Sequence, residues 1–269
     1  MKPLAEDSKA RVVAVYDAAA ATYNRVGPSF FLHFGKRLAS VTGILPGSDV
    51  LDLATGTGAA VVPAAAVVGP EGRVVGIDLS SGMINRARAE IRHRGIEHAH
   101  VLVADADHLP FPDQSFDVVS CSFAIFLFLS LSRPIAESHR VLRSSGRIGF
   151  VYSAGEDSEW RWYEQLISRY RPKASLGTER YRPQDVEAAL SEAGFKDVST
   201  TVEVHQLTFA NAAEFWGWAW SHGDRAVLES LTGSTVEFER ELFEQFGRRA
   251  GPKGVTYRVF AALTLATRR

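Results

Sequence analysis

The chain has 269 residues, of which 46% are hydrophobic and 23% charged, which is enough apolar material for the core of one large domain. Its 30 basic and 31 acidic residues leave a formal net charge of −1, so no overall field attracts a nucleic acid or an anionic membrane surface. The single cysteine, Cys121, excludes an internal disulfide and a cysteine-based zinc cage. The composition therefore predicts a globular protein with neither a nucleic-acid nor a membrane partner.

The N-terminal sequence MKPLAEDSKARVVAVYD has acidic residues where a signal peptide needs an apolar segment. The longest apolar stretch, VVSCSFAIFLFLSL at residues 118–131, has 14 residues and contains three serines. A membrane helix requires about 20 residues, so buried core is the better interpretation of this stretch. We expect a cytoplasmic protein.

Short apolar segments rich in β-branched residues recur through the first 155 residues, and helical patterns such as SGMINRARAEIRHRG (81–95) and RPIAESHRVLRSSG (133–146) lie between them. This alternation predicts an α/β fold with a Rossmann-like, doubly wound, mostly parallel sheet whose ligand lies at the carboxyl ends of the strands. The predicted strands are residues 50–54, 73–79, 99–106, 116–123 and 147–153.

The pattern changes after residue 153. A helix is predicted at 182–195 and strands at 196–209 and 255–268, which brings the sheet to seven strands. The helical, aromatic-rich block at 211–250 is far longer than a hairpin loop, so we expect it to form a lid with its own packing. The predicted parts are an N-terminal helical cover (1–40), a cofactor-binding core (41–210), the lid (211–250) and the last core strand (251–269).

The turn in GILPGSDVLDLATGTGAAV (43–61) joins an apolar strand to a helix. A dinucleotide fingerprint, G-x-G-x-x-G, would need glycine where Val61 stands, and no Lys-Ser/Thr follows to hold a triphosphate. An NAD-dependent oxidoreductase is therefore disfavoured. An adenosyl ligand without phosphates suits this turn better.

Four segments in the right order carry a family resemblance: VLDLATGTG (50–58), VVGIDLSSGMINRAR (74–88), ADADHLPFPDQSFDVV (104–119) and RVLRSSGRIGF (140–150). Together they resemble the class I S-adenosylmethionine (SAM) dependent methyltransferases, and in particular the ubiquinone/menaquinone C-methyltransferase-like group (methyltransferase type 11). The resemblance implies SAM as cofactor and S-adenosylhomocysteine as product. Two departures bear on the acceptor and the turn: alanine stands at 54, where the family commonly has glycine, and IFLF (125–128) replaces a more polar loop of the quinone enzymes.

The resemblance also assigns cofactor contacts. Asp52 would lie near the ammonium group of SAM, and Asp78, 20 residues after Gly58, would accept both ribose hydroxyls. Met83 would pack against the adenine, whose exocyclic amine would donate to Asp105. An alternative in which Asp52 and Asp105 only cap strand ends stays open. The predicted cofactor-binding residues are Asp52, Ala54, Gly56, Gly58, Asp78, Leu79, Met83, Asp105, Ala106, Ser122, Phe123 and Tyr23.

Aromatic residues mark a candidate acceptor site. Tyr16 and Tyr23 are seven residues apart and would share one face of an N-terminal helix that covers bound SAM. In the lid sequence EFWGWAWSH, Phe215, Trp218 and His222 share one helical face, and Trp216 and Trp220 share another. Simple core packing is the competing interpretation. The predicted pocket residues are Phe126, Trp216, Trp218 and His222, and the candidate catalytic residues are His33, His222 and Tyr23, with His205 as a further histidine near the lid.

The sequence thus predicts a metal-independent methyltransferase that acts on an oxygen or carbon atom of a small hydrophobic or aromatic metabolite, natural product or quinone-like. A base is optional, because the sulfonium is already a good leaving group. Two alternatives remain: a SAM-binding fold repurposed as a cyclase, and a non-catalytic partner. Whether the chain forms a homo-oligomer is left open.

Overall fold

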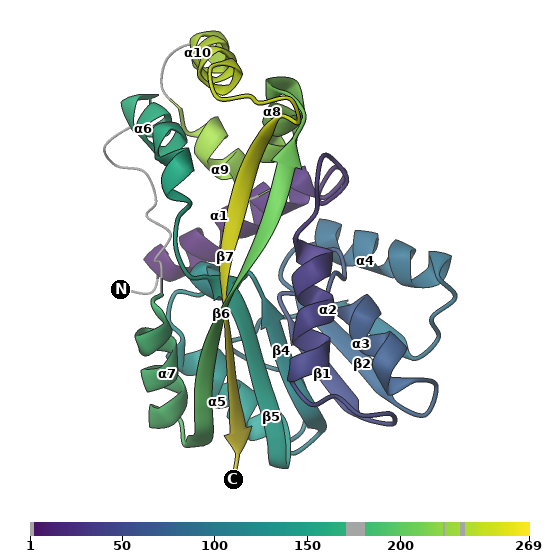
Figure 1. The fold of residues 1–269 in the computed structure, drawn as a ribbon. Coiled ribbons are helices and arrows are strands. Elements are labelled where there is room, and N and C mark those ends of the chain that lie inside the picture. The colour runs from purple at the N-terminus through teal and green to yellow at the C-terminus, as the bar shows by residue number, and fades with distance from the viewer. Residues whose placement is uncertain (1–2, 171–180, 223, 232–234) are drawn as a thin grey trace.

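The computed structural model describes residues 3–170, 181–222, 224–231 and 235–269. In these residues one seven-stranded sheet has the order β3-β2-β1-β4-β5-β7-β6, and β7 alone runs opposite to its neighbours (Figure 1). The predicted Rossmann-like, mostly parallel sheet is therefore confirmed. The strands are β1 (Asp49–Leu53), β2 (Arg73–Asp78), β3 (Ala99–Val103), β4 (Phe116–Ser122), β5 (Leu142–Ser153), β6 (Phe195–Phe209) and β7 (Val255–Arg268).

All seven strands lie where the sequence predicts them, but the start of β5 differs. The helix predicted at 133–146 ends at Val141, and β5 begins at Leu142, which pairs with Phe116 of β4. A register shift follows, and Ser145 takes a left-handed conformation with φ of 67°. The Ser-Ser-Gly segment is thus an irregular stretch of strand, because sheet pairing outweighs its helical pattern.

Helices cover both faces of the sheet (Figure 1). α2 (Phe31–Val41), α3 (Val61–Val68) and α4 (Ser81–His93) pack on one face, and α5 (Ser132–Val141) and α7 (Pro183–Glu192) pack on the other. The strands between them are buried on both sides, which accounts for their continuous apolar sequences. The central strands end together beneath the N-terminal helix and the lid.

The N-terminal helix α1 (Pro3–Ala19) lies across the carboxyl ends of the strands (Figure 1). Polar contacts hold it there: Lys9 Nζ is 2.6 Å from a carboxylate oxygen of both Asp105 and Asp107, and Asp17 accepts from the Ser80 hydroxyl. The helix ends at Ala19, so Tyr23 lies beyond the face that the sequence predicts it to share with Tyr16. The two rings still approach, with centroids 5.9 Å apart.

The insertion between β6 and β7 forms helices α8 (Ala212–Trp220), α9 (Asp224–Glu229) and α10 (Thr235–Gly247), which stand above the sheet (Figure 1). Short 3-10 turns lie at Ile125–Leu127 and Ser158–Trp160, and the second leads into α6 (Arg161–Tyr170). α6 falls in the range predicted as cofactor-binding core, yet it packs with the lid helices in a largely aromatic cluster that continues onto α2 and strands β5, β6 and β7. That cluster includes Trp160, Tyr163, Leu166, Phe215, Trp218, Phe238, Leu242 and Phe246.

Candidate active site

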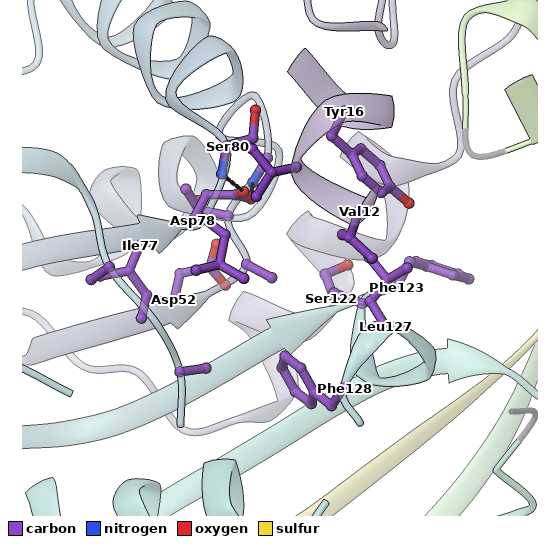
Figure 2. Close-up of a pocket in the computed structure, with 18 of the residues that line it drawn as sticks. Val12, Tyr16, Asp52, Ile77, Asp78, Ser80, Ser122, Phe123, Leu127 and Phe128 are labelled. Atoms are coloured by element: carbon purple, nitrogen blue, oxygen red, sulfur yellow. Dashed lines mark hydrogen bonds between the residues drawn. The ribbon is translucent and has the colours of Figure 1, made fainter. Parts of the chain in front are cut away.

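A cavity opens where β1, β2 and β4 end beneath α1, and we call it the strand-end cavity (Figure 2). On the side of α1 it is lined by Lys9, Val12 and Tyr16. Ten of the twelve predicted cofactor residues line it, since the carboxyl ends of parallel strands meet at one edge of a sheet. These ten are Asp52, Ala54, Gly56, Asp78, Leu79, Asp105, Ala106, Ser122, Phe123 and Tyr23.

Every second residue in the turn after β1 has a left-handed backbone conformation. Ala54, Gly56 and Gly58 have φ of 49°, 54° and 89°. A Cβ added at Gly56 would meet no atom within 4 Å, so the backbone of this turn is open to a ligand. Alanine at 54 tolerates the conformation that glycine would adopt more easily, at a cost of about 1 kcal/mol.

The Asp78 carboxylate connects the ends of β1 and β2. It accepts hydrogen bonds from the amides of Gly56 and Ser80, both at 2.9 Å (Figure 2). Burial raises the pKa of Asp78, and the nearby Asp17 adds to the rise, although these amide bonds oppose it. Each carboxylate oxygen keeps further acceptor capacity, so the group suits a vicinal diol such as that of a ribose.

Asp52 lies deeper in the same cavity, where its residue is only 2% exposed. Burial raises the pKa of its carboxyl to about 6, against the effect of the hydrogen bond that the Ser120 hydroxyl donates at 2.7 Å. A buried carboxylate of this kind favours a cationic neighbour. The ammonium group of a methionine moiety has the required charge.

The last residue of β4 and the residue after it shape the floor of the cavity. The Ser122 hydroxyl is buried and has no hydrogen-bond partner among the described residues, which marks a place for a polar ligand atom. Phe123 has φ of 53°, unusual for a bulky residue, and its amide donates to the Val151 carbonyl at 2.7 Å. The strained conformation directs its ring to the wall of the cavity (Figure 2).

Asp105 already has partners in this structure. Lys9 Nζ donates to one carboxylate oxygen and the Asp107 amide donates to the other at 3.0 Å. Partial burial works to raise the pKa of Asp105, but these hydrogen bonds outweigh it and the net pKa falls. An adenine amine would therefore share this carboxylate with the N-terminal helix.

Two predicted cofactor residues do not line the strand-end cavity. Met83 is 1% exposed, because its position in the first turn of α4 directs it into the helix–sheet core. Gly58 lies behind the turn, and a Cβ there would stand 3.6 Å from Ala87. The structure thus separates these two from the other ten.

A second cavity, which we call the aromatic cavity, lies between the lid and the strand ends. The two cavities share a wall made of Tyr16, Tyr23, Phe31 and Phe123. Three of the four predicted pocket residues, Phe126, Trp218 and His222, line the aromatic cavity. Further lining residues that the sequence did not single out are Phe30, Phe31, Tyr152, Tyr181, Tyr257 and Val259.

These further residues come from β5, β7, the start of α2 and the segment before α7, and only the aromatic pair in GPSFF (27–31) gave a local signal in the sequence. The Phe30 and Phe31 rings lie 4.9 and 5.7 Å from Phe123. Tyr152 and Tyr257 are strand residues, and they line a cavity only because the lid lies over them. Because their place in the cavity depends on contacts between distant segments, no local sequence pattern identifies these residues.

His222 is the buried titratable group of the aromatic cavity, at 4% exposure. Its Nδ1 is 2.6 Å from the Trp218 carbonyl oxygen and 2.9 Å from the Ser221 hydroxyl. Burial lowers the pKa of His222 to about 4, although the bond to the Trp218 carbonyl opposes this. The side chain is a neutral imidazole at physiological pH.

Trp216 and His33 line neither cavity. Trp216 is on the other face of α8, where its ring lies 5.6 Å from Trp220 and 6.0 Å from Phe238. His33 stacks on His205 with ring centroids 3.9 Å apart, on the side of α2 that faces β6. The two lid faces expected from the helical period are present, but only the Trp218 face meets a cavity.

Within the described ranges, no group of three or more His, Cys, Asp or Glu side chains is arranged to hold a metal ion. A search of the same ranges finds no helix with the length and apolarity to cross a membrane.

The strand order and the strand-end cavity define a nucleoside-binding Rossmann-like enzyme, and comparisons narrow the class. Residues 50–146 match the model of a methyltransferase domain family. A nocamycin O-methyltransferase from Saccharothrix syringae is 34% identical over 267 residues, covering 91% of this chain and 95% of that protein. A ubiquinone/menaquinone biosynthesis C-methyltransferase from Shewanella oneidensis is 35% identical over 153 residues, 55% of this chain and 61% of its own.

Solved structures agree on the fold. A putative methyltransferase from Bacillus halodurans superposes with a TM-score of 0.61 at 23% identity, over 87% of this chain and 98% of that one. The [4+2]-cyclase SpnF superposes with a TM-score of 0.60 at 18% identity, over 96% of both chains. The chain belongs to the class I SAM-dependent methyltransferases, and its cofactor is SAM.

We expect Asp78→Ala to weaken the binding of both SAM and S-adenosylhomocysteine by about 5- to 100-fold, the worth of hydrogen bonds to a charged group. Isothermal titration calorimetry measures both affinities. Asp113→Ala is a suitable control, since Asp113 pairs with Arg140 on the surface, 71% exposed. Unchanged affinity in a folded Asp78→Ala protein would refute the role of Asp78.

SAM affinity should fall in acid as Asp52 becomes protonated. The ammonium group pairs with the carboxylate, whose pKa is about 6 without ligand, so affinity is full above pH 7. It should drop by up to about tenfold for each pH unit below 6, because the carboxylate form is progressively lost. Calorimetry between pH 5 and 8 tests this, and Asp52→Asn should bind more weakly with a flatter pH dependence. Equal slopes for both proteins would contradict the assignment.

Proposed function

We propose that this enzyme transfers the methyl group of SAM to an oxygen or carbon atom of a small hydrophobic or aromatic metabolite, a natural product or a quinone-like compound. The observation that carries the proposal is the wall of Tyr16, Tyr23, Phe31 and Phe123 that the two cavities share. Because the two cavities share these four residues, a ligand in the aromatic cavity lies next to a ligand in the strand-end cavity at this boundary. Methyl transfer needs such an approach, because alignment of nucleophile and methyl supplies much of the acceleration.

The residues of the strand-end cavity suit SAM in charge and hydrogen bonding. The roles of Asp78 at the ribose and Asp52 at the ammonium are those predicted from the sequence, and Ser122 and Phe123 take a place near the sulfonium. Bound SAM supplies a methyl group on a positively charged sulfur. The protein holds it against the aromatic cavity and excludes water there.

The relatives favour an acceptor from natural-product chemistry. The nocamycin O-methyltransferase aligns with 91% of the chain, whereas the C-methyltransferase of quinone biosynthesis aligns with 55% of it. An aklanonic acid methyltransferase from a Streptomyces strain is 37% identical over 150 residues, 55% of this chain and 68% of that protein. The likeness to the cyclase SpnF concerns the fold alone, so it lends the cyclase alternative no weight.

The remaining parts of the proposal are a cytoplasmic, metal-independent enzyme with neither a nucleic-acid nor a membrane partner. The near-zero net charge supports the absence of nucleic-acid and membrane partners. The decisive test is transfer of radiolabel from methyl-labelled SAM to a panel of hydroxylated naphthalenes, anthraquinones and naphthoquinols. Bound SAM with no transfer to any member would favour the non-catalytic or cyclase alternative.

Trp218→Ala should raise the acceptor KM or lower kcat by about 10- to 100-fold, because it removes a large aromatic wall from the aromatic cavity. SAM affinity should change little. Trp216→Ala is the matched control, since it removes the same side chain from the other face of α8 and should mainly lower the melting temperature. Equal kinetic effects of the two variants would mean that both tryptophans only hold the lid together.

Turnover should be unchanged after dialysis against EDTA, because methyl transfer from a sulfonium needs no Lewis acid. Radiolabel transfer before and after dialysis measures this. Loss of activity that magnesium restores would contradict a metal-independent mechanism.

A further inference from the structure

His222 has one ring nitrogen bound and one without a partner. Nδ1 lies 2.6 Å from the Trp218 carbonyl oxygen, and a carbonyl only accepts hydrogen bonds, so Nδ1 carries the proton. The Ser221 hydroxyl donates to the same carbonyl at 2.8 Å and reinforces this arrangement. Nε2 therefore presents a lone pair, and it has no hydrogen-bond partner among the described residues.

The surroundings of Nε2 are aromatic. The His222 ring lies 4.6 Å from the Trp218 ring and 5.4 and 5.5 Å from the rings of Phe31 and Tyr23, measured between centroids. A buried acceptor left without a donor costs about 1–3 kcal/mol, so this nitrogen needs a ligand group to complete it. Phe31 and Tyr23 belong to the wall shared with the strand-end cavity, so the His222 ring lies beside the boundary between the two cavities.

We propose that Nε2 of His222 is the catalytic base that takes the proton of an un-ionised phenol or enol hydroxyl, which makes the enzyme an O-methyltransferase for neutral hydroxylated aromatic acceptors. The proposal rests on the proposed function and deepens it, because it selects oxygen over carbon. A lone pair held by a fixed tautomer is suited to a hydroxyl donor, and the oxygen that gives up its proton to Nε2 is itself the atom that becomes nucleophilic there.

The step balances as follows. The acceptor O–H bond breaks and its proton goes to Nε2, which leaves His222 as an imidazolium. An oxygen lone pair forms the new bond to the methyl carbon while the S–C bond breaks, and the electron pair of that bond stays on sulfur. The products are a methyl ether and neutral S-adenosylhomocysteine, and the imidazolium returns its proton to water when the products leave.

Burial lowers the pKa of His222 to about 4, and this value determines the pH dependence of the free enzyme. The imidazole is neutral throughout pH 6–9, so the wild-type rate should be flat there. Other titratable groups that line the same cavity come from several elements and are tyrosines and one carboxylate. They are Tyr16, Tyr23, Tyr152, Tyr181, Asp224 and Tyr257.

The test compares His222→Gln with wild type on two probes, 2-naphthol and pentafluorophenol, whose hydroxyl is already ionised at neutral pH. We expect about a 100-fold loss of kcat with 2-naphthol and little loss with pentafluorophenol, since an ionised oxygen needs no base. The 2-naphthol rate of the variant should also rise about tenfold per pH unit between pH 6 and 9. His139→Gln, whose ring packs on Phe195 away from both cavities, should match wild type.

A measurement on the wild-type protein does not depend on the folding of the variant. With ¹⁵N-labelled histidine and S-adenosylhomocysteine present, 2-naphthol should shift the Nε2 resonance of His222, and 2-methoxynaphthalene, which has no hydroxyl, should not. An unshifted resonance with bound 2-naphthol, equal losses on both probes, or a product methylated on carbon would overturn the role of His222. Absence of both transfer and binding for the whole acceptor panel would instead overturn the proposed function.

Discussion

The carboxylate of Asp78 is the constraint on which the cofactor side of the molecule depends. By accepting from the amides of Gly56 and Ser80, it fixes the turn after β1 to the turn after β2. The left-handed turn is thereby held open toward the cavity, and Ser80 is placed to cap α4 and to contact Asp17 of α1. One buried acid thus sets the shape of the cavity and the position of its cover.

The acceptor side is built differently. Its walls are aromatic rings from the lid, the N-terminal segment and the long strands β5 and β7, and their packing is continuous with the core of the lid. Such walls discriminate by shape and apolar area and supply few hydrogen bonds. The directional groups in these walls include the tyrosine hydroxyls, Asp224 and His222, and the proposed role of His222 makes it the one that decides which acceptor atom reacts.

Much of this architecture could be predicted from the sequence, because strands and strand-end residues leave local patterns. Residues at the carboxyl ends of three separate strands, such as Asp52, Asp78 and Ser122, converge as predicted, since parallel topology brings those ends together. Met83, Trp216 and His33 show the limit. A helical period separates the faces of a helix, but it does not tell which face meets a cavity. The place of α6 in the lid and the tautomer of His222 depend on contacts between distant segments, which no single window of sequence contains.

The position of α1 couples the two cavities. Tyr16 of this helix lies in the walls of both cavities, and α1 also touches α9 of the lid. Its hold on the core through Lys9 is ionic and partly exposed, so salt in the medium weakens it. A displacement of α1 would uncover the strand-end cavity and remove one wall of the aromatic cavity in the same movement. The fold thus ties both cavities to the position of one helix, and the ionic strength of the medium acts on both through the same two ion pairs.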